Sequence, residues 1–210
     1  MNHIDSANFQ LLKMEVHRRV VPGLRHNMLG KLQPIALLSQ ILSKKLDIGN
    51  VDLDYIKTQT DEIKLNAKLL TTATQNLFSW MEDEQLQLPA EVLVKECLEL
   101  LKMECYSKHL QVSNHVTSSH LLSAQLARVV VCTVMIVLAD KTCEDKSLDI
   151  SMTDETLQFT WNQACEAADS SHPGRLANWD WIHDFDGAQC QISMIKYGMR
   201  VHFPASSNEM

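Results

Sequence analysis

The stretch "DLDYIKTQTDEIKLNAKLLTTATQNLFSWME", residues 52–82, carries a heptad pattern. Side chains of one row recur at seven-residue intervals, namely Ile56, Ile63, Leu70 and Leu77. A second row of small or apolar side chains follows four residues after each of these, namely Thr60, Ala67, Thr74 and Met81. Rows at this spacing are typical of a helix that packs along another helix. The stretch therefore predicts a long helix with a continuous packing seam.

The preceding segment supplies the partner helix. Residues 8–46 also show helical periodicity, and "DIGN", residues 47–50, reads as the turn between two antiparallel helices. A single hairpin buries only one side of each helix, whereas two hairpins from two chains form a four-helix bundle. We therefore expect a homodimer. The alternative is that the hairpin packs only on the second half of its own chain.

The pattern of the sequence changes after "EDEQLQLPA", residues 82–90, a segment that we interpret as a linker. Beyond it we expect three helices and five strands. The last helix is short and lies between the third and fourth strands. The helices are expected at 90–106, 121–141 and 176–186; the strands are expected at 110–116, 148–152 and 156–161, and in "QCQISMIK" and "MRVHFP", which pair across Tyr197 and Gly198. Residues 162–175 read as irregular. The fold class is α+β, with a helical hairpin domain over 1–85 and an α/β sandwich domain over 86–210, whose helices cover one face of a mixed sheet.

Bulk properties exclude several functions. The 210 residues have a net charge of −7 and no dense run of Lys and Arg, so a nucleic-acid partner is not expected. None of the six cysteines forms a C-x-x-C pair, and several lie in apolar runs, which favours free buried thiols in a reducing compartment over disulfides. The N-terminus lacks signal-peptide character, and the longest apolar run, 129–139, is too short to span a bilayer. We expect a cytoplasmic protein that does not enter a membrane.

The segment "GLRHNMLGKLQPIALL", residues 23–38, places a histidine opposite the apolar face of the first helix. At about 100° per residue, one stripe contains Leu24, Met28, Leu32, Ile35, Leu38 and Leu42. His26 falls on the other side of the helix, with Leu29 and Leu37 on the same outer face. Exposed leucines beside an exposed histidine indicate a docking surface. The alternative is that His26 is one of nine histidines and has no role.

Around His26 the sequence resembles one phosphoacceptor pattern of the sensor histidine kinases. That pattern is His-Asp/Asn, an apolar residue, any residue, Asn/Gly, any residue, Leu, two of any residue, Ile. Here His26, Asn27, Met28, Gly30, Leu32 and Ile35 occupy those places. The expected order of elements, a helical hairpin and then an α/β sandwich, is similar to that family over nearly the whole chain. The resemblance implies that His26 accepts a phosphoryl group and that the partner is the receiver domain of a response regulator.

The same resemblance suggests which neighbours contact the partner. Arg25 and Lys31 would attract an acidic receiver site, and Leu29 and Leu37 would supply apolar contact. Gly30 and Gln33 complete the expected partner-binding set. Asn27 departs from the acidic residue that often follows the histidine and draws its proton. Gly30 stands where many family members have Thr or Asn for phosphatase activity, so that activity is not expected.

Helix breakers flank His26. Pro34 cannot donate to the carbonyl of Gly30, and its ring crowds that carbonyl, whereas Pro22 and Gly23 precede His26 by about one turn. We expect a bent helix that moves the His26 segment relative to the seam. The alternative is that Pro22 and Gly23 separate two shorter helices.

The nucleotide site of the resembled family is missing its motifs. The helix that should carry asparagines has Leu138 before Ala139, and Mg²⁺ needs oxygen ligands that Leu lacks. Where Asp-x-Gly-x-Gly is expected, Asn162, Ala164 and Glu166 stand instead. No other phosphate-binding glycine motif is present in the sequence. We therefore expect no ATP, no Mg²⁺ and no other cofactor.

Two further clusters have simpler explanations. Asp180, His183, Asp184 and Asp186 could line one helix face and bind a metal, but a solvated acidic face is favoured. Trp161, Trp179 and Trp181 are expected to pack in the core rather than to form a pocket.

Three functions follow from these patterns. The first is a histidine phosphotransferase, derived from a kinase, that relays a phosphoryl group through His26 to or from a response regulator. The second is a non-catalytic pseudokinase or adaptor dimer that binds and regulates a response regulator or a kinase, with His26 incidental. The third is an autokinase with an atypical nucleotide site.

Overall fold

The computed structural model describes residues 7–49, 52–82, 86–163, 181–182 and 190–203. The chain divides into two compact units, one of residues 1–20 and 84–210 and one of residues 21–83. We call them the sandwich unit and the hairpin unit. Their boundary near residue 84 lies close to the one expected at 85. The division differs from the expected domains in its first 20 residues, which belong to the sandwich unit.

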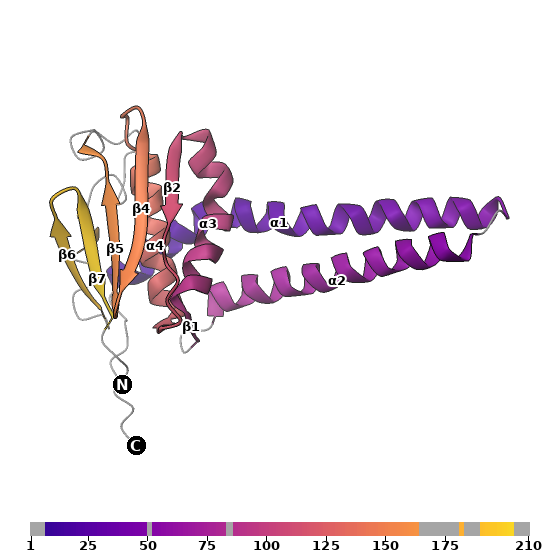
Figure 1. Cartoon of the computed structure of the whole chain (residues 1–210), viewed down its shortest axis with the longest axis horizontal. Helices are drawn as coiled ribbons and strands as arrows, with labels where there is room; N and C mark the ends of the chain where they lie inside the picture. Colours follow the sequence, from indigo (N-terminus) through magenta and orange to yellow (C-terminus); the bar gives the residue numbers. More distant parts are fainter. Residues whose placement is uncertain (1–6, 50–51, 83–85, 164–180, 183–189, 204–210) are drawn as a thin grey trace, which may run out of the picture. The chain divides into compact units, whose positions relative to one another are not determined.

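The hairpin unit consists of the greater part of helix α1 (Ala7–Asp47) and of helix α2 (Leu53–Glu82), as Figure 1 shows. At the end of α1, Gly49 adopts a positive φ of 71° and donates its backbone N–H to the carbonyl of Leu46 at 3.1 Å. At the start of α2, the Asp52 carboxylate accepts the backbone N–H of Asp54 at 3.0 Å, as a helix cap does. The two predicted helices and their turn are confirmed.

Helix α1 is continuous through Pro22 and Pro34. The alternative of two shorter helices separated at Pro22 and Gly23 is therefore wrong. An interior proline costs about 3 kcal/mol because it lacks an N–H and crowds the preceding turn, so packing on both sides must offset it. The division between the two units falls between Val20 and Val21, directly before Pro22.

The sandwich unit contains a five-stranded mixed sheet in the order β2-β4-β5-β7-β6. Its strands are β2 (Leu110–Asn114), β4 (Lys146–Thr153), β5 (Thr156–Trp161), β6 (Gln191–Ile195) and β7 (Gly198–His202). Strands β2 and β4 are parallel, and all the other neighbours are antiparallel. A separate ribbon pairs β1 (Gln87–Pro89) with β3 (Leu121–Ser123). The predicted mixed sheet is confirmed.

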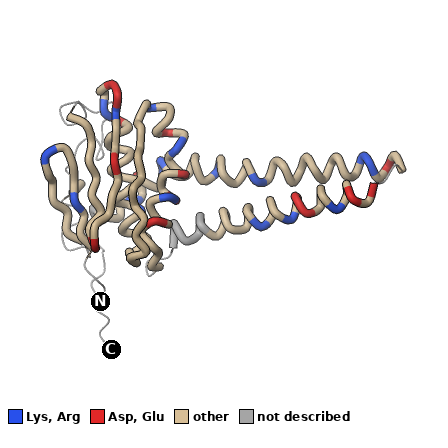
Figure 2. The backbone as a smooth tube through the Cα atoms, in the orientation of Figure 1, with Lys and Arg blue, Asp and Glu red and all other residues tan. Residues whose placement is uncertain are grey.

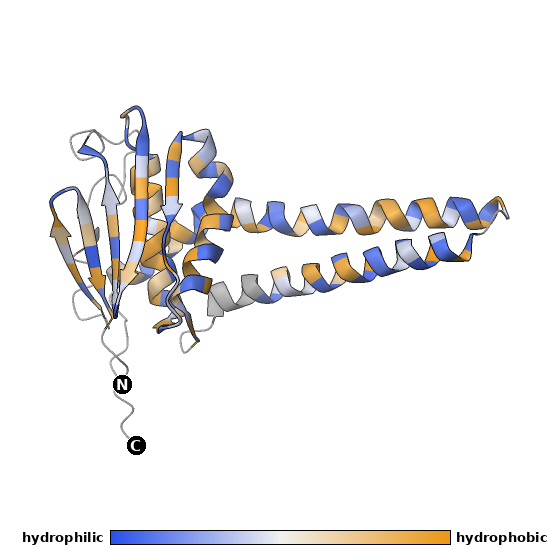
Figure 3. Cartoon of the chain, viewed as in Figure 1, coloured by the Kyte–Doolittle hydropathy of each residue, from blue (hydrophilic) through white to orange (hydrophobic). Residues whose placement is uncertain are grey.

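Helices α3 (Ala90–Ser107) and α4 (Ala124–Ala139) pack on the inner face of this sheet. Burial alternates along β5, where Leu157, Phe159 and Trp161 are buried and the residues between them are not. In α4 every residue except Gln125 is buried, and most of the buried residues are apolar, which gives the visible part of the helix its largely orange colour in Figure 3. The core of the unit lies between α4 and the sheet.

Several element boundaries differ from the prediction. Residues 121–123 form β3 rather than the first turn of a helix, and 87–89 form β1 inside the expected linker, because the two segments pair with each other. Strand β4 begins at Lys146, two residues before the expected start. The last hairpin turns through Lys196 and Tyr197, and Tyr197 has a φ of 57°. The helix expected at 176–186, apart from residues 181–182, and most of 162–175 lie outside the described residues.

No helix in the part of the chain that the structure describes has the length and apolar character needed to cross a membrane.

Candidate functional site

His26 lies on the exposed face of α1, in the hairpin unit. Leu29 and Leu37 share this exposure, with 42% and 58% of their surface accessible. Arg25, Gly30 and Gln33 are also exposed, whereas Asn27 and Lys31 are half-buried. The outward position predicted for His26 and the two leucines is confirmed. The expected partner-binding residues thus lie within four turns of one helix, between Arg25 and Leu37.

The opposite stripe of α1 is only partly covered. Leu24 is 7% exposed, and Met28, Ile35, Leu38 and Leu42 are half-buried. Leu32, predicted on the buried stripe, is 47% exposed, so that expectation is wrong for a single chain. The reason is geometric, because one neighbouring helix covers only a narrow part of the circumference of α1.

The two helices of the hairpin unit differ in charge, because α2 carries both lysines and carboxylates. From Val21 to Leu46, on α1, the sequence holds four Lys or Arg residues and no carboxylate. The acidic residues of the hairpin lie on α2 and beside the turn, as the red positions in Figure 2 show. Arg25 adjoins His26 and is exposed, whereas Lys31 lies five residues further along, on the partly covered side of the helix. The surface around the histidine therefore favours an acidic partner.

The positions that should bind a nucleotide in the resembled family carry no oxygen ligand on α4. Leu138, which stands where the family pattern has Asn, is a fully buried apolar side chain, as is Val134 one turn before it, and Ala139 is 1% exposed. Arg128, nearer the start of α4, is committed to Glu96 of α3 through charge-assisted hydrogen bonds of 3.0 to 3.2 Å. These residues do not fit a magnesium nucleotide, whose metal needs hard oxygen donors.

Asn162, at the end of β5, occupies the place expected for the acidic residue of the nucleotide turn. Its side-chain amide donates to the backbone carbonyl of Asp145 at 2.5 Å. This bond ties the end of β5 to the loop between α4 and β4. The side chain therefore has a structural partner within the unit. Ala164 and Glu166, the other two residues of this expected motif, lie outside the described residues.

A cluster of charged residues that the sequence analysis did not find holds the first turns of α1 on the sandwich unit. The Arg19 guanidinium donates to both carboxylate oxygens of Asp140 at 3.0 Å and, through Nε, to Glu104 at 2.8 Å. Lys108 lies 3.4 Å from the same Asp140 carboxylate. Burial lowers the pKa of Arg19, but the hydrogen bonds to Asp140 and Glu104 outweigh it and raise that pKa overall. No local motif marks this cluster, because its members are far apart in the sequence.

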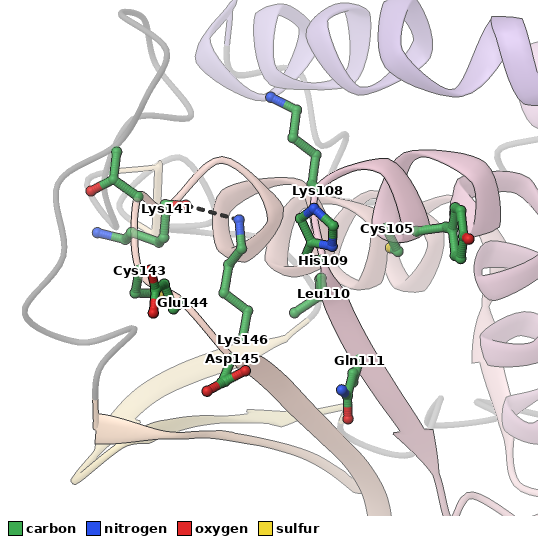
Figure 4. A pocket seen from close by; sticks show the side chains of 12 residues that line it. Cys105, Lys108, His109, Leu110, Gln111, Lys141, Cys143, Glu144, Asp145 and Lys146 are labelled. Atoms are coloured by element: carbon green, nitrogen blue, oxygen red, sulfur yellow. Dashed lines mark hydrogen bonds between the residues drawn. The ribbon is translucent and has the colours of Figure 1, made fainter.

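A cavity of about 590 Å³ opens where β2 and β4 begin (Figure 4). Each strand is preceded by a residue with positive φ, His109 at 56° and Asp145 at 53°. Lys146 donates from Nζ to the carbonyls of Ala139 and Lys141 at 2.6 and 2.9 Å, and so caps the end of α4. Lys108 and Lys146 are two of the cations that line this cavity. Each of them contacts α4 or the residue that caps it, so both have a structural role.

The remaining candidates are partly resolved. Trp161 and Trp181 are buried at 5% and 0% exposure, as predicted for core residues. Trp179 and the acidic cluster of Asp180, His183, Asp184 and Asp186 lie outside the described residues. Within the described ranges, no group of three or more His, Cys, Asp or Glu side chains could hold a metal ion.

Five cysteines within the described ranges, Cys97, Cys105, Cys132, Cys143 and Cys190, are free thiols. Burial raises the pKa of Cys105 and that of Cys190 to about 12. Buried thiols with raised pKa values are poor nucleophiles, so neither is a candidate catalytic residue.

Comparison with known proteins gives no family model and no curated protein that matches this chain. Among solved structures, the cytoplasmic segment of histidine kinase QseC is similar at a TM-score of 0.40 and 8% identity, over 81% of this chain and 94% of that one. The Acinetobacter baumannii histidine kinase AdeS is similar at a TM-score of 0.36 and 14% identity, over 80% and 92%. Histidine kinase ThkA, in complex with response regulator protein TrrA, is similar at a TM-score of 0.39 and 14% identity, over 95% and 66%. Each is described as a histidine kinase, the family that the motif around His26 resembles.

Proposed function

We propose that this protein is a histidine phosphotransferase that exchanges a phosphoryl group between His26 and the receiver domain of a response regulator. The observation that carries the proposal is the exposed His26 on a helix face with exposed leucines on either side of it and the exposed cation Arg25 next to it in the sequence. A phosphorylated receiver carries its phosphoryl group on an aspartate beside other carboxylates. A cationic surface with apolar contacts is complementary to such a partner.

The chemistry requires only positioning. A neutral imidazole nitrogen of His26 attacks the phosphorus of the aspartyl phosphate, and an N–P bond forms as the P–O bond to the aspartate breaks. The electron pair of that P–O bond returns to the aspartate carboxylate, and the imidazole proton passes to water. Placing donor and acceptor in line supplies most of the catalysis in phosphoryl transfer. The reverse reaction follows the same path.

We propose further that the protein does not use ATP. Leu138 and Val134 offer no oxygen to a metal, and Asn162 is bonded to the backbone of Asp145. The phosphoryl group would then come from a receiver domain. On this proposal the sandwich unit retains a fold without its nucleotide chemistry, and it helps to hold the partner.

A homodimer would complete the hairpin. Ile56, Ile63 and Leu70 of the α2 seam are half-buried in one chain, and Leu32 of α1 is 47% exposed. A second hairpin packed against these residues would form a four-helix bundle. The mass of the protein in solution tests this assembly, and we expect two chains for the wild type and one for Leu32→Glu, which places a charge in the seam.

The transfer is tested by incubating the wild type and His26→Gln with a panel of receiver domains phosphorylated by acetyl phosphate. His115→Gln is the matched control, because His115 is also an exposed histidine. We expect acid-labile label on the wild type and on His115→Gln, and none on His26→Gln. Binding of a receiver by all three proteins without transfer would favour the adaptor function instead. Label from Mg-ATP alone would show an autokinase and contradict the proposal.

A further inference from the structure

Gly30 lies in the interior of α1, four residues after His26 and on the same face of the helix. Its position is exposed. A glycine inside a helix lowers helix stability relative to alanine, because its backbone loses more freedom on folding. Unless the folded chain requires a glycine there, its presence needs a reason outside the chain.

Two other glycines of this protein show what an internal reason looks like. Gly49 has a φ of +71° in the hairpin turn, a conformation that strains other residues. At Gly198 a Cβ atom would lie 2.4 Å from the backbone oxygen of Phe159, so a side chain there would collide with the neighbouring strand. Each of these glycines is demanded by its own backbone conformation or by its packing.

Gly30 has neither reason. Its φ is outside the left-handed region, and apart from residues 29 and 31 and the local helix backbone, no described atom lies within 4 Å of the Cβ position. The ring of Pro34, one turn further along, is among the atoms outside that distance. A side chain at position 30 would therefore project into open space one turn from His26.

We propose that Gly30 is a clearance position, at which the surface of the receiver domain approaches the α1 backbone closely enough to reach His26. This inference rests on the proposed function. The occupant is a receiver domain because the surrounding residues fit its chemistry. The exposed Arg25 matches its carboxylates, and Leu29 and Leu37, exposed by 42% and 58%, supply apolar contact.

The consequence for transfer is geometric. The imidazole nitrogen and the phosphorus must approach to about 3–3.5 Å, and a misplacement of about 1 Å can slow such a reaction about 100-fold. A methyl or isobutyl group at position 30 would hold the partner away from the helix. The effect should grow with side-chain size and should oppose the effect on helix stability.

The test compares Gly30→Ala and Gly30→Leu with Ser43→Leu, which adds bulk at an exposed position of the same helix outside the docking surface. Each protein is measured for its urea midpoint, its mass in solution and its rate of transfer from the phosphorylated receiver that labels the wild type. We expect both Gly30 variants to have higher urea midpoints, because Ala and Leu favour helix. We expect transfer to slow about tenfold for Gly30→Ala and about 100-fold for Gly30→Leu, with Ser43→Leu within twofold of the wild type.

Three results would overturn the inference. Transfer at the wild-type rate by both Gly30 variants would show that position 30 needs no clearance, while transfer through His26 would stand. Lower urea midpoints would assign Gly30 to the folding of the helix itself. Loss of the dimer in the Gly30 variants alone would assign it to contact with a second copy. A wild type that takes no label from any receiver would instead overturn the proposed function, and this inference with it.

Discussion

One helix, α1, has two contrasting halves. Residues 7–20 belong to the sandwich unit, where Phe9, Leu12, Val16 and Val20 are fully buried. Residues 21–47 belong to the hairpin unit, where Leu24 is the only large apolar side chain of the α1 stripe that is fully covered among the described residues. The change occurs at Pro22, without any break in the helix.

The contrast shows that an apolar stripe in the sequence does not identify the surface that will cover it. The first half of α1 finds its partner within its own chain and is fixed there by Arg19. The second half remains half-covered by α2, which is the state expected of a helix that also packs on a second copy. Each of the following predictions tests this difference between the two halves.

The largest effect is expected at the start of α1. Phe9→Ala removes a fully buried aromatic side chain and should lower the free energy of unfolding by about 3–5 kcal/mol, because it leaves a cavity in a packed core. Leu29→Ala, on the exposed face of the second half, should change it by less than about 0.5 kcal/mol. Urea denaturation of both variants measures the difference. Equal effects would contradict the division of α1 into two environments.

The Arg19 cluster should contribute less to the free energy of unfolding than the Phe9 side chain does. Arg19→Gln leaves the buried Asp140 and the partly buried Glu104 without their guanidinium partner, although Lys108 still lies 3.4 Å from Asp140. We expect a loss of about 2–3 kcal/mol, somewhat below that of a fully buried pair.

Arg18→Gln is the matched control for that change, since the Arg18 side chain is 75% exposed and pairs with the Glu15 carboxylate at 4.0 Å. An exposed pair of this kind contributes little. Amide hydrogen exchange over residues 7–20 should rise in Arg19→Gln and stay unchanged in Arg18→Gln. A rise in both variants would show that helix charge, and not the cluster, holds this segment.

The smallest effect concerns alkaline pH. The folded pKa of Cys105 and of Cys190 is raised to about 12 by burial, above the ordinary thiol value of 9.0. Between these values the unfolded chain loses a proton that the folded chain keeps, so stability is unchanged below pH 9 and falls as pH rises toward 12. At pH 10.5 each thiol should cost about 2 kcal/mol.

Denaturation at pH 8 and pH 10.5 checks this dependence for the wild type and for Cys105→Ala with Cys190→Ala. The double variant should lose less stability between the two pH values than the wild type does. An identical loss would mean that other groups control the alkaline response. Because both thiols lie in the sandwich unit, the hairpin unit should not share this effect.

Local periodicity accounts for what could be predicted. The heptad rows of residues 52–82, the period of residues 8–46 and the alternation along β5 each arise from contacts between near neighbours in sequence. They were sufficient for the hairpin, the mixed sheet and the outward position of His26. The β1–β3 ribbon was missed because its two segments are short and more than 30 residues apart, so that neither has a period of its own.

The sequence by itself determined the two hairpin helices, the strands of the five-stranded sheet, the outward position of His26 and the absence of nucleotide motifs, because each of these is a property of residues close together in the chain. Only the tertiary structure decided where the first half of α1 packs. Arg19 meets Glu104 and Asp140 across 85 and 121 residues, and no local pattern encodes such a contact. It also decided that Gly30 faces open space. The open space beside a glycine depends on which surfaces the rest of the folded chain does not cover. Only the folded structure determines those surfaces.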